Sequence, residues 1–237
     1  MSPAVPLPRS LPSLPAEVGD LMDHTPESAY AHLRDTRPAW FSSPPGEGSI
    51  GITRWPMTEG QVLHRDAERV VLEDPVVLPD GQHARRLRLL AARPEPPVAV
   101  LPLLDGQVVL VDRFRHAART WQWEVLRGAG VEGISDDQNA AGQLKHHLGA
   151  TASEMIGLGR VDPDPEIVAD AVMLYAARID AVGGLAQDAD AGIRGVRALA
   201  FAEAEEMALT GRITDAVTIA LLFRARRAGL GEGGPAA

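Results

Sequence analysis

The sequence predicts an α/β protein: a succession of strands, one helix in the middle of the chain and two helices near its carboxyl end. Two observations carry this prediction. The apolar runs 98–104 and 108–112 flank Asp105-Gly106 and are typical of hairpin strands covered on both faces. The segment 137–148 has apolar residues at helical spacing and ends at Gly149, a residue that favours the left-handed backbone of a helix end.

The first 56 residues contain ten of the 19 prolines, so we expect an extended or irregular extension over residues 1–56. One helix is predicted within it, from Pro26, which follows the capping residue Thr25, to Leu33. The large aromatic side chains of the extension are too apolar for a free tail, and we expect them to pack on the rest of the chain or on a partner: Trp40, Phe41 and Trp55.

Residues 57–97 are predicted to form an amino-terminal β region. The run 69–78 ends at Pro79-Asp80-Gly81, a strong turn signal, and 85–91 returns as the second strand of a hairpin. Further strands and helices are expected along the rest of the chain. The strands are 121–127, 169–178 and 196–200, and the helices are 203–210 and 215–228. We also expect a glycine-rich loop at 183–192 and a flexible tail at 230–237.

The predicted helix 137–148 has Ser135 or Asp136 as its cap. With about 100° between successive residues, its side chains divide into two faces. The apolar face is Ala141, Leu144 and Leu148, and the opposite face, which we expect to be exposed, is Gln143, His146 and His147.

Composition excludes several classes of function. The formal net charge of −9 argues against a general nucleic-acid binder, because phosphate affinity depends on clustered Lys and Arg. Without cysteine the chain has no disulfide, no thiol catalysis and no cysteine-ligated zinc. It has no apolar run of about 18 residues and no signal-peptide pattern, so we expect a cytoplasmic protein without membrane contact.

Several motifs occur in order along the second half of the chain. They are Val109-Leu-Val-Asp-Arg-Phe-Arg, Trp123-Glu-Val-Leu-Arg-Gly, the frame of 128–149, and Gly211-Arg-Ile-Thr-Asp-Ala-Val-Thr. Together they resemble the Nudix superfamily, and specifically its ADP-ribose pyrophosphatase branch, over about residues 70–229. The resemblance implies an α/β/α fold with a mixed sheet between helices and a core at 98–229. It also implies a homodimer in which amino-terminal strands help to build the partner's substrate site.

The signature of this family, the Nudix box, keeps its frame here but not its charged residues. Gly128, Leu144 and Gly149 fall in register, whereas the first glutamate position is Ile134 and the arginine position is Gly142. The three glutamate positions on the helix are Gln143, His146 and His147. In the family these carboxylates hold divalent metals that activate water, and hard cations prefer oxygen ligands. We therefore expect magnesium-dependent diphosphate hydrolysis to be lost, and no metal or other cofactor to be bound.

Four residues are the predicted catalytic groups. His146 and His147 are chosen because imidazole exchanges protons near neutral pH; a transition-metal site and drift after metal binding lapsed are the alternatives. Glu132 is the best remaining acid in the box. Asp170 matches, by the resemblance, a loop acid that serves active relatives as base or metal ligand.

Four more residues are the predicted ligand contacts: Gln143, Arg115, Glu124 and Glu166. For Arg115 the alternative is a solvated charge at a strand end, for Glu124 a buried hydrogen-bonded role, and for Glu166 a loop carboxylate in water. Trp121 and Trp123 have the chemistry to stack on a ring, but core packing is the favoured prediction for both.

Three functions compete on this evidence. The favoured one is a metal-independent general acid/base enzyme that acts on a small molecule, in a biosynthetic pathway. The second is a non-catalytic protein that binds a nucleotide-sugar-like ligand. The third is a divergent hydrolase of ADP-ribose or nucleoside diphosphates that uses displaced acids such as Asp136, Asp137 and Glu166.

Overall fold

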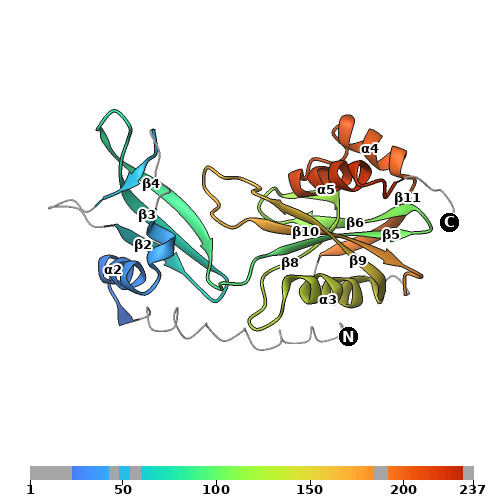
Figure 1. Cartoon of the computed structure of the whole chain (residues 1–237), viewed down its shortest axis with the longest axis horizontal. Helices are drawn as coiled ribbons and strands as arrows, with labels where there is room; N and C mark the ends of the chain where they lie inside the picture. Colours follow the sequence, from blue (N-terminus) through green and yellow to red (C-terminus); the bar gives the residue numbers. More distant parts are fainter. Residues whose placement is uncertain (1–22, 43–47, 54–59, 184–191, 232–237) are drawn as a thin grey trace, which may run out of the picture. The chain divides into compact units, whose positions relative to one another are not determined.

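The computed structural model describes residues 23–42, 48–53, 60–183 and 192–231, which divide into two units by their contacts. Unit 1 lies within residues 1–93 and also includes 166–169, and unit 2 is formed from 94–165 and from residue 170 onward. Figure 1 shows the elements of each unit. The predictions made for Trp55 and for most of the loop 183–192 and of the tail 230–237 lie outside the described residues.

Unit 1 contains an antiparallel sheet in which β3 is paired on both of its sides. Its elements are α2 (Pro26–Thr36), the short helix η2 (Pro38–Phe41), β1 (Gly51–Ile52), β2 (Gln61–Arg65), β3 (Arg69–Val77) and β4 (His83–Ala91). Val77 pairs with His83 across the turn, which confirms the predicted hairpin.

Helix α2 begins where the sequence predicts. The hydroxyl of Thr25 accepts a hydrogen bond from the backbone N–H of Ser28 at 3.3 Å, and the helix runs on to Thr36. Its buried face packs on the sheet, and the aromatic residues that follow it are partly buried against the same cluster, as expected. The cluster consists of Ala29, Tyr30, Leu33, Val62, Val70, Leu72, Leu90 and Ala92, with Trp40 and Phe41 packed against it.

A buried carboxylate ties the helices of unit 1 to the sheet. Tyr30 donates its hydroxyl proton to Asp74 Oδ1 at 2.6 Å, and Asp74 is only 1% exposed. Arg88 pairs with the same carboxylate and also donates from Nη1 to the carbonyl oxygen of Trp40 at 2.6 Å. Because each polar group in this cluster has a partner, the carboxylate is tolerated in an apolar environment.

Unit 2 is built on a mixed sheet, which is seven-stranded within the described residues. The strands are β5 (Val98–Leu104), β6 (Gln107–Arg115), β7 (Thr120–Glu124), β8 (Leu126–Gly128), β9 (Ala152–Val161), β10 (Val172–Ile179) and β11 (Ile193–Leu199). The order is β11-β6-β5-β10-β9, with β7 paired to β6 and β8 paired to β5. Strands β10 and β5 are parallel and the other pairs are antiparallel.

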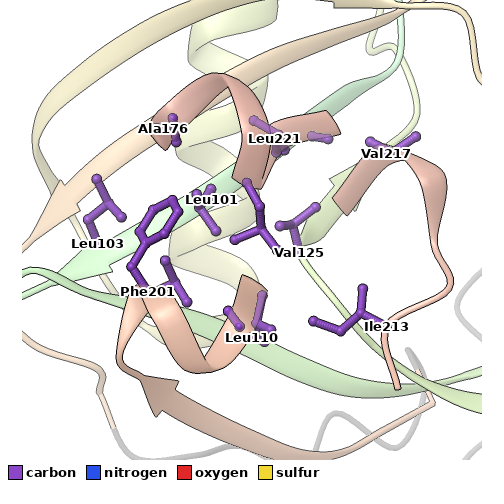
Figure 2. Close-up of a cluster of buried hydrophobic side chains, with 14 of the residues drawn as sticks. Leu101, Leu103, Leu110, Val125, Ala176, Phe201, Ile213, Val217 and Leu221 are labelled. Carbon is purple, nitrogen blue, oxygen red and sulfur yellow. The ribbon is translucent and has the colours of Figure 1, made fainter. Parts of the chain in front are cut away.

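Helices cover both faces of this sheet, with α3 (Asp136–Leu148) on one face and α4 (Phe201–Leu209) and α5 (Ala216–Arg227) on the other (Figure 1). Alternate residues of β5 supply the two cores: Ala99 and Leu101 belong to the cluster under α4 and α5, and Val98 and Val100 to the cluster under α3. Figure 2 shows the first cluster, with Phe201 among the strand residues. The structure therefore confirms the predicted α/β/α arrangement.

The chain changes its strand partner at Val125, from β6 to β5. The predicted strand 121–127 is divided there, because β7 pairs with β6 whereas β8 pairs with β5. The buried N–H of Val125 donates to Thr218 Oγ1 at 3.1 Å, and Thr218 in turn donates to Asp215 Oδ2 at 2.6 Å. Asp215 also accepts from the backbone N–H of Thr218 and so caps α5, as predicted. No described helix is both long and apolar enough to cross a membrane.

Candidate functional site

Helix α3 carries Gln143, His146 and His147, and these polar residues do not all lie as the sequence predicted. The helix follows Ser135 and ends at Gly149, which has φ 60° in the left-handed region; both boundaries match the prediction. His146 is exposed, but His147 is only 7% exposed, so its predicted exposure was wrong. Ala140, rather than Ala141, lies in the apolar core. The buried face is rotated by about one residue relative to the predicted face.

Gln143 joins α3 to the preceding loop. Its side-chain amide donates to Asn139 Oδ1 at 3.1 Å, and Asn139 donates from Nδ2 to the carbonyl oxygen of Ala129 at 2.8 Å. A Cβ atom at Gly128 would lie 2.3 Å from Gln143 Nε2, so the glycine makes room for this amide. Gln143, a predicted ligand contact, therefore has a structural role in holding the entry to the helix.

Charged residues from β6 and β7 meet the carboxyl end of α3. In β6, Val109 and Val111 pack in the core under α3, and the alternation of the strand places Arg113 and Arg115 on that same face. Glu124 pairs with Val111 across β6 and β7 and shares the face. We call Arg113, Arg115, Glu124 and His147 the polar cluster.

The polar cluster contains one short bidentate pair and two longer contacts. Arg115 forms two parallel hydrogen bonds to Glu124, from Nε to Oε2 at 2.7 Å and from Nη2 to Oε1 at 2.6 Å. Arg113 Nη1 lies 3.6 Å from Glu124 Oε1, and Arg113 Nη2 lies 3.3 Å from His147 Nε2. Arg113 thus connects the carboxylate of β7 to His147 near the carboxyl end of α3.

Burial sets the electrostatics of the polar cluster. Glu124 is fully buried, and this burial raises the pKa of its carboxyl even though two guanidinium groups lower it. Because a guanidinium can only donate, His147 Nε2 is the acceptor in its contact with Arg113. In this contact His147 is therefore neutral and carries its proton on Nδ1.

The other predicted site residues come from several different segments of the chain. Glu132 is exposed in the loop that leads from β8 to α3, and Asp170 is half-buried just before β10. Glu166 is exposed and belongs to the segment 166–169, which groups with unit 1. Asp136 accepts a hydrogen bond from the hydroxyl of Tyr175, and burial together with this bond raises the pKa of Tyr175 to about 12.

Two residues of the site were missed at the level of sequence. Asn139 precedes Gln143 by four residues and so shares its helix face, a spacing that was available as a signal. Arg113 alternates with the apolar residues Val109 and Val111, which indicates the covered face of its strand. The burial of Arg113 was not predicted, because arginine side chains are mostly exposed in folded proteins.

The two tryptophans of β7 have opposite environments. Trp123 packs against the core under α4 and α5, as predicted. Trp121 is 39% exposed, so the prediction of core packing was wrong for this residue. Within the part of the chain that is described, no group of three or more His, Asp or Glu side chains is arranged to hold a metal ion.

Comparison with known proteins places the fold. No family model matches the sequence, and no curated protein sequence matches it. A solved structure titled "ADP compounds hydrolase" is similar, with a TM-score of 0.62 and 16% sequence identity over 78% of this chain and 96% of that chain. The fold is Nudix-like. At this identity the likeness concerns the Nudix-like fold alone, and it agrees with the α/β/α arrangement that the motifs implied.

Proposed function

We propose that this Nudix-like chain acts on a small molecule by general acid/base catalysis and does not use a divalent metal. The observation that carries the proposal is the 3.3 Å contact between Arg113 Nη2 and His147 Nε2. In the family the position of His147 is a glutamate that helps to hold cations. Here the side chain at that position is neutral and accepts a hydrogen bond from a permanently charged guanidinium.

Electrostatics favour this proposal over a magnesium site. Taken alone, the Arg113 guanidinium would repel a divalent ion about 5 Å away at His147 by about 7 kcal/mol at an effective dielectric constant of about 20. Glu124 offsets only part of this repulsion, because its single charge is shared between Arg113 and Arg115. Neither Gln143 nor His147 supplies a negative charge to offset this repulsion. The residues at the box positions therefore do not fit the family's metal ions, and we route no step of the chemistry through a metal.

The proposed proton-transfer group is His146. It is exposed, and its ring lies 4.6 Å from the ring of the buried His147, centroid to centroid. An exposed imidazole exchanges protons with a ligand near neutral pH, whereas His147, held by Arg113, is better suited to fix the end of the helix. Glu132 and Asp170 stay candidates for the second acid or base, and the predicted homodimer stays a prediction.

A second function, ligand binding without turnover, is favoured by a different observation. Gln143 is bound to Asn139, and both oxygens of Glu124 are bound by Arg115. Polar groups that are satisfied inside the protein stabilise a site but are not poised for chemistry. On this alternative the nucleotide-sugar-like ligand would be bound and released unchanged.

The first experiment asks whether α3 binds a divalent ion at all. Manganese, a spin probe for magnesium sites, is titrated into the protein and followed by electron paramagnetic resonance. We expect no loss of the free-ion signal beyond that of a protein without a metal site. Stoichiometric binding that magnesium displaces, and that His147→Ala abolishes, would refute the proposal.

The second experiment uses ADP-ribose, because the similar solved structure is titled as a hydrolase of ADP compounds. Thermal stability and AMP release are measured with EDTA and with magnesium. Release of AMP in EDTA that falls about 100-fold in His146→Ala supports acid/base catalysis. The matched control is His116→Ala, another exposed histidine of unit 2, which should leave the rate unchanged. Thermal stabilisation by ADP-ribose without AMP release supports ligand binding without turnover. Release of AMP that depends on magnesium supports the divergent hydrolase.

A further inference from the structure

A second group of side chains lies on the opposite face of the sheet from the polar cluster. It consists of Phe114, Arg119, Trp121 and Arg194, and we call it the aromatic–arginine patch. Phe114 alternates with Arg113 and Arg115 along β6, so it points away from the face that α3 covers. Trp121 pairs directly with Phe114 across β6 and β7 and is therefore on the same face.

The patch is a continuous series of ring and guanidinium contacts. The guanidinium carbon of Arg119 lies 5.1 Å from the centre of the Phe114 ring, and Phe114 meets Trp121 edge to face at 5.5 Å. The guanidinium carbon of Arg194 lies 4.0 Å from the centre of the Trp121 ring. This last distance is that of a guanidinium placed directly over an aromatic face.

A buried carboxylate holds Arg194 in this position. Arg194 donates from Nε to Asp112 Oδ2 at 2.7 Å, and Asp112 is only 7% exposed. The Arg194 side chain nevertheless keeps 55% of its surface in solvent, and Trp121 keeps 39%. The pair is thus fixed from within but open from outside, so a ligand that stacks on it would not have to order a flexible arginine first.

We propose that the aromatic–arginine patch is a binding site for a planar aromatic ring that carries a negative charge, such as a nucleoside monophosphate. The ring of the ligand stacks on the outer face of the Arg194 guanidinium, whose inner face lies on Trp121. Nucleic-acid bases stack on arginine side chains in the same way in RNA-binding proteins. The charge of the patch is complementary to such a ligand, because Arg119 and Arg194 flank the rings and both can pair with a phosphate. This site goes beyond the proposed function, since the polar cluster and α3 lie on the other face of the sheet.

The test uses AMP as the probe, with adenosine and ribose 5-phosphate as its two halves, and measures the dissociation constant by calorimetry in EDTA. We expect AMP to bind more tightly than either half. Arg194→Ala should raise the dissociation constant for AMP about tenfold, which is the loss of one stacking partner. Arg194→Lys should recover only part of this loss, because an ammonium keeps the charge but not the plane.

The matched control is Arg178→Ala. Arg178 is 49% exposed and is held through its Nε by Glu154 at 2.9 Å, so it resembles Arg194 in exposure and pairing. Unlike Arg194, it has no aromatic partner within the part of the chain that the structure describes. It should bind AMP as the unchanged chain does. Equal affinity for AMP in Arg194→Ala and the unchanged chain would overturn the proposal, and so would the absence of AMP binding at millimolar concentration. Loss of AMP affinity in Arg113→Gln but not in Arg194→Ala would place the ligand at the polar cluster and would also overturn it.

Discussion

Thr218→Val is the substitution whose cost follows most directly from the structure. Thr218 is fully buried, accepts from the N–H of Val125 at 3.1 Å and donates to Asp215 Oδ2 at 2.6 Å. Valine has the same shape but neither bond. A buried N–H left without an acceptor costs about 1–3 kcal/mol, and a hydrogen bond to a charged group contributes about 1.5–3 kcal/mol.

The sum is reduced because Asp215 keeps two other donors, the backbone N–H of Thr218 at 2.9 Å and Arg127 Nη1 at 3.0 Å. We therefore expect Thr218→Val to lower the free energy of unfolding of unit 2 by about 3 kcal/mol. Urea unfolding followed by circular dichroism measures it, because a change in midpoint at constant slope reports stability. Thr218→Ser is the control: it keeps the hydroxyl and removes one methyl group, which should cost about 1 kcal/mol.

The comparison of the two variants decides whether the hydroxyl is responsible. If Thr218→Ser destabilised unit 2 as much as Thr218→Val, packing of the methyl group would be the cause and the hydrogen-bond reasoning would be refuted. If Thr218→Val cost less than about 1 kcal/mol, the change of strand partner at Val125 would not depend on this bond.

Three further predictions concern the same chain. The native protein should show no tyrosinate absorbance near pH 10, because burial raises the pKa of both of its tyrosines, that of Tyr175 to about 12. Since the pKa is raised in the folded state, the contribution of these tyrosines to stability is kept below pH 10 and lost as pH rises through 12. An absorbance step near pH 10 that precedes unfolding would contradict this prediction. Gly149→Ala should lower the free energy of unfolding by about 1 kcal/mol, because φ at this residue is 60°. Gly142→Ala, inside α3 with open space around the added Cβ, should raise the free energy of unfolding by about 0.5–1 kcal/mol. Chemical denaturation measures both variants, and a change of the same sign in both would refute this reasoning. The double variant Arg113→Gln, His147→Glu should bind manganese, whereas the single variant His147→Glu should not, because the Arg113 guanidinium would still repel the ion. Electron paramagnetic resonance measures the binding. Equal binding by the two variants would show that the guanidinium does not repel the ion.

The local signals in the sequence were strong where turn chemistry decides the backbone. Asp105 and Gly106 both have positive φ, 49° and 77°, which is the two-residue turn that their residue types favour, and the hairpin of β5 and β6 follows from it. Gly149 likewise ends α3 at the predicted residue. In these cases the conformation depends on neighbouring residues alone, so one sequence is sufficient.

The features that were missed depend on contacts between distant residues. The break between β7 and β8 is fixed by Thr218, which lies 93 residues from Val125 in the sequence. Strand β9 was not predicted: all of its residues are exposed or half-buried and two of them are glycines, so no apolar run marks it. The burial of His147 follows from Arg113 on another element, and helical spacing could not distinguish a rotation of one residue.

The anchoring of Asp74 has a practical consequence for anyone who shortens this chain. A fragment that starts at the predicted boundary after residue 56 would lack Tyr30 and the carbonyl of Trp40, while Asp74 and Arg88 would stay on the hairpin beneath. The ion pair of Asp74 and Arg88 would then be exposed to water, and so would the neighbouring apolar side chains of Val70 and Leu72. Such a truncation should aggregate on expression, whereas one that begins before Thr25 should not.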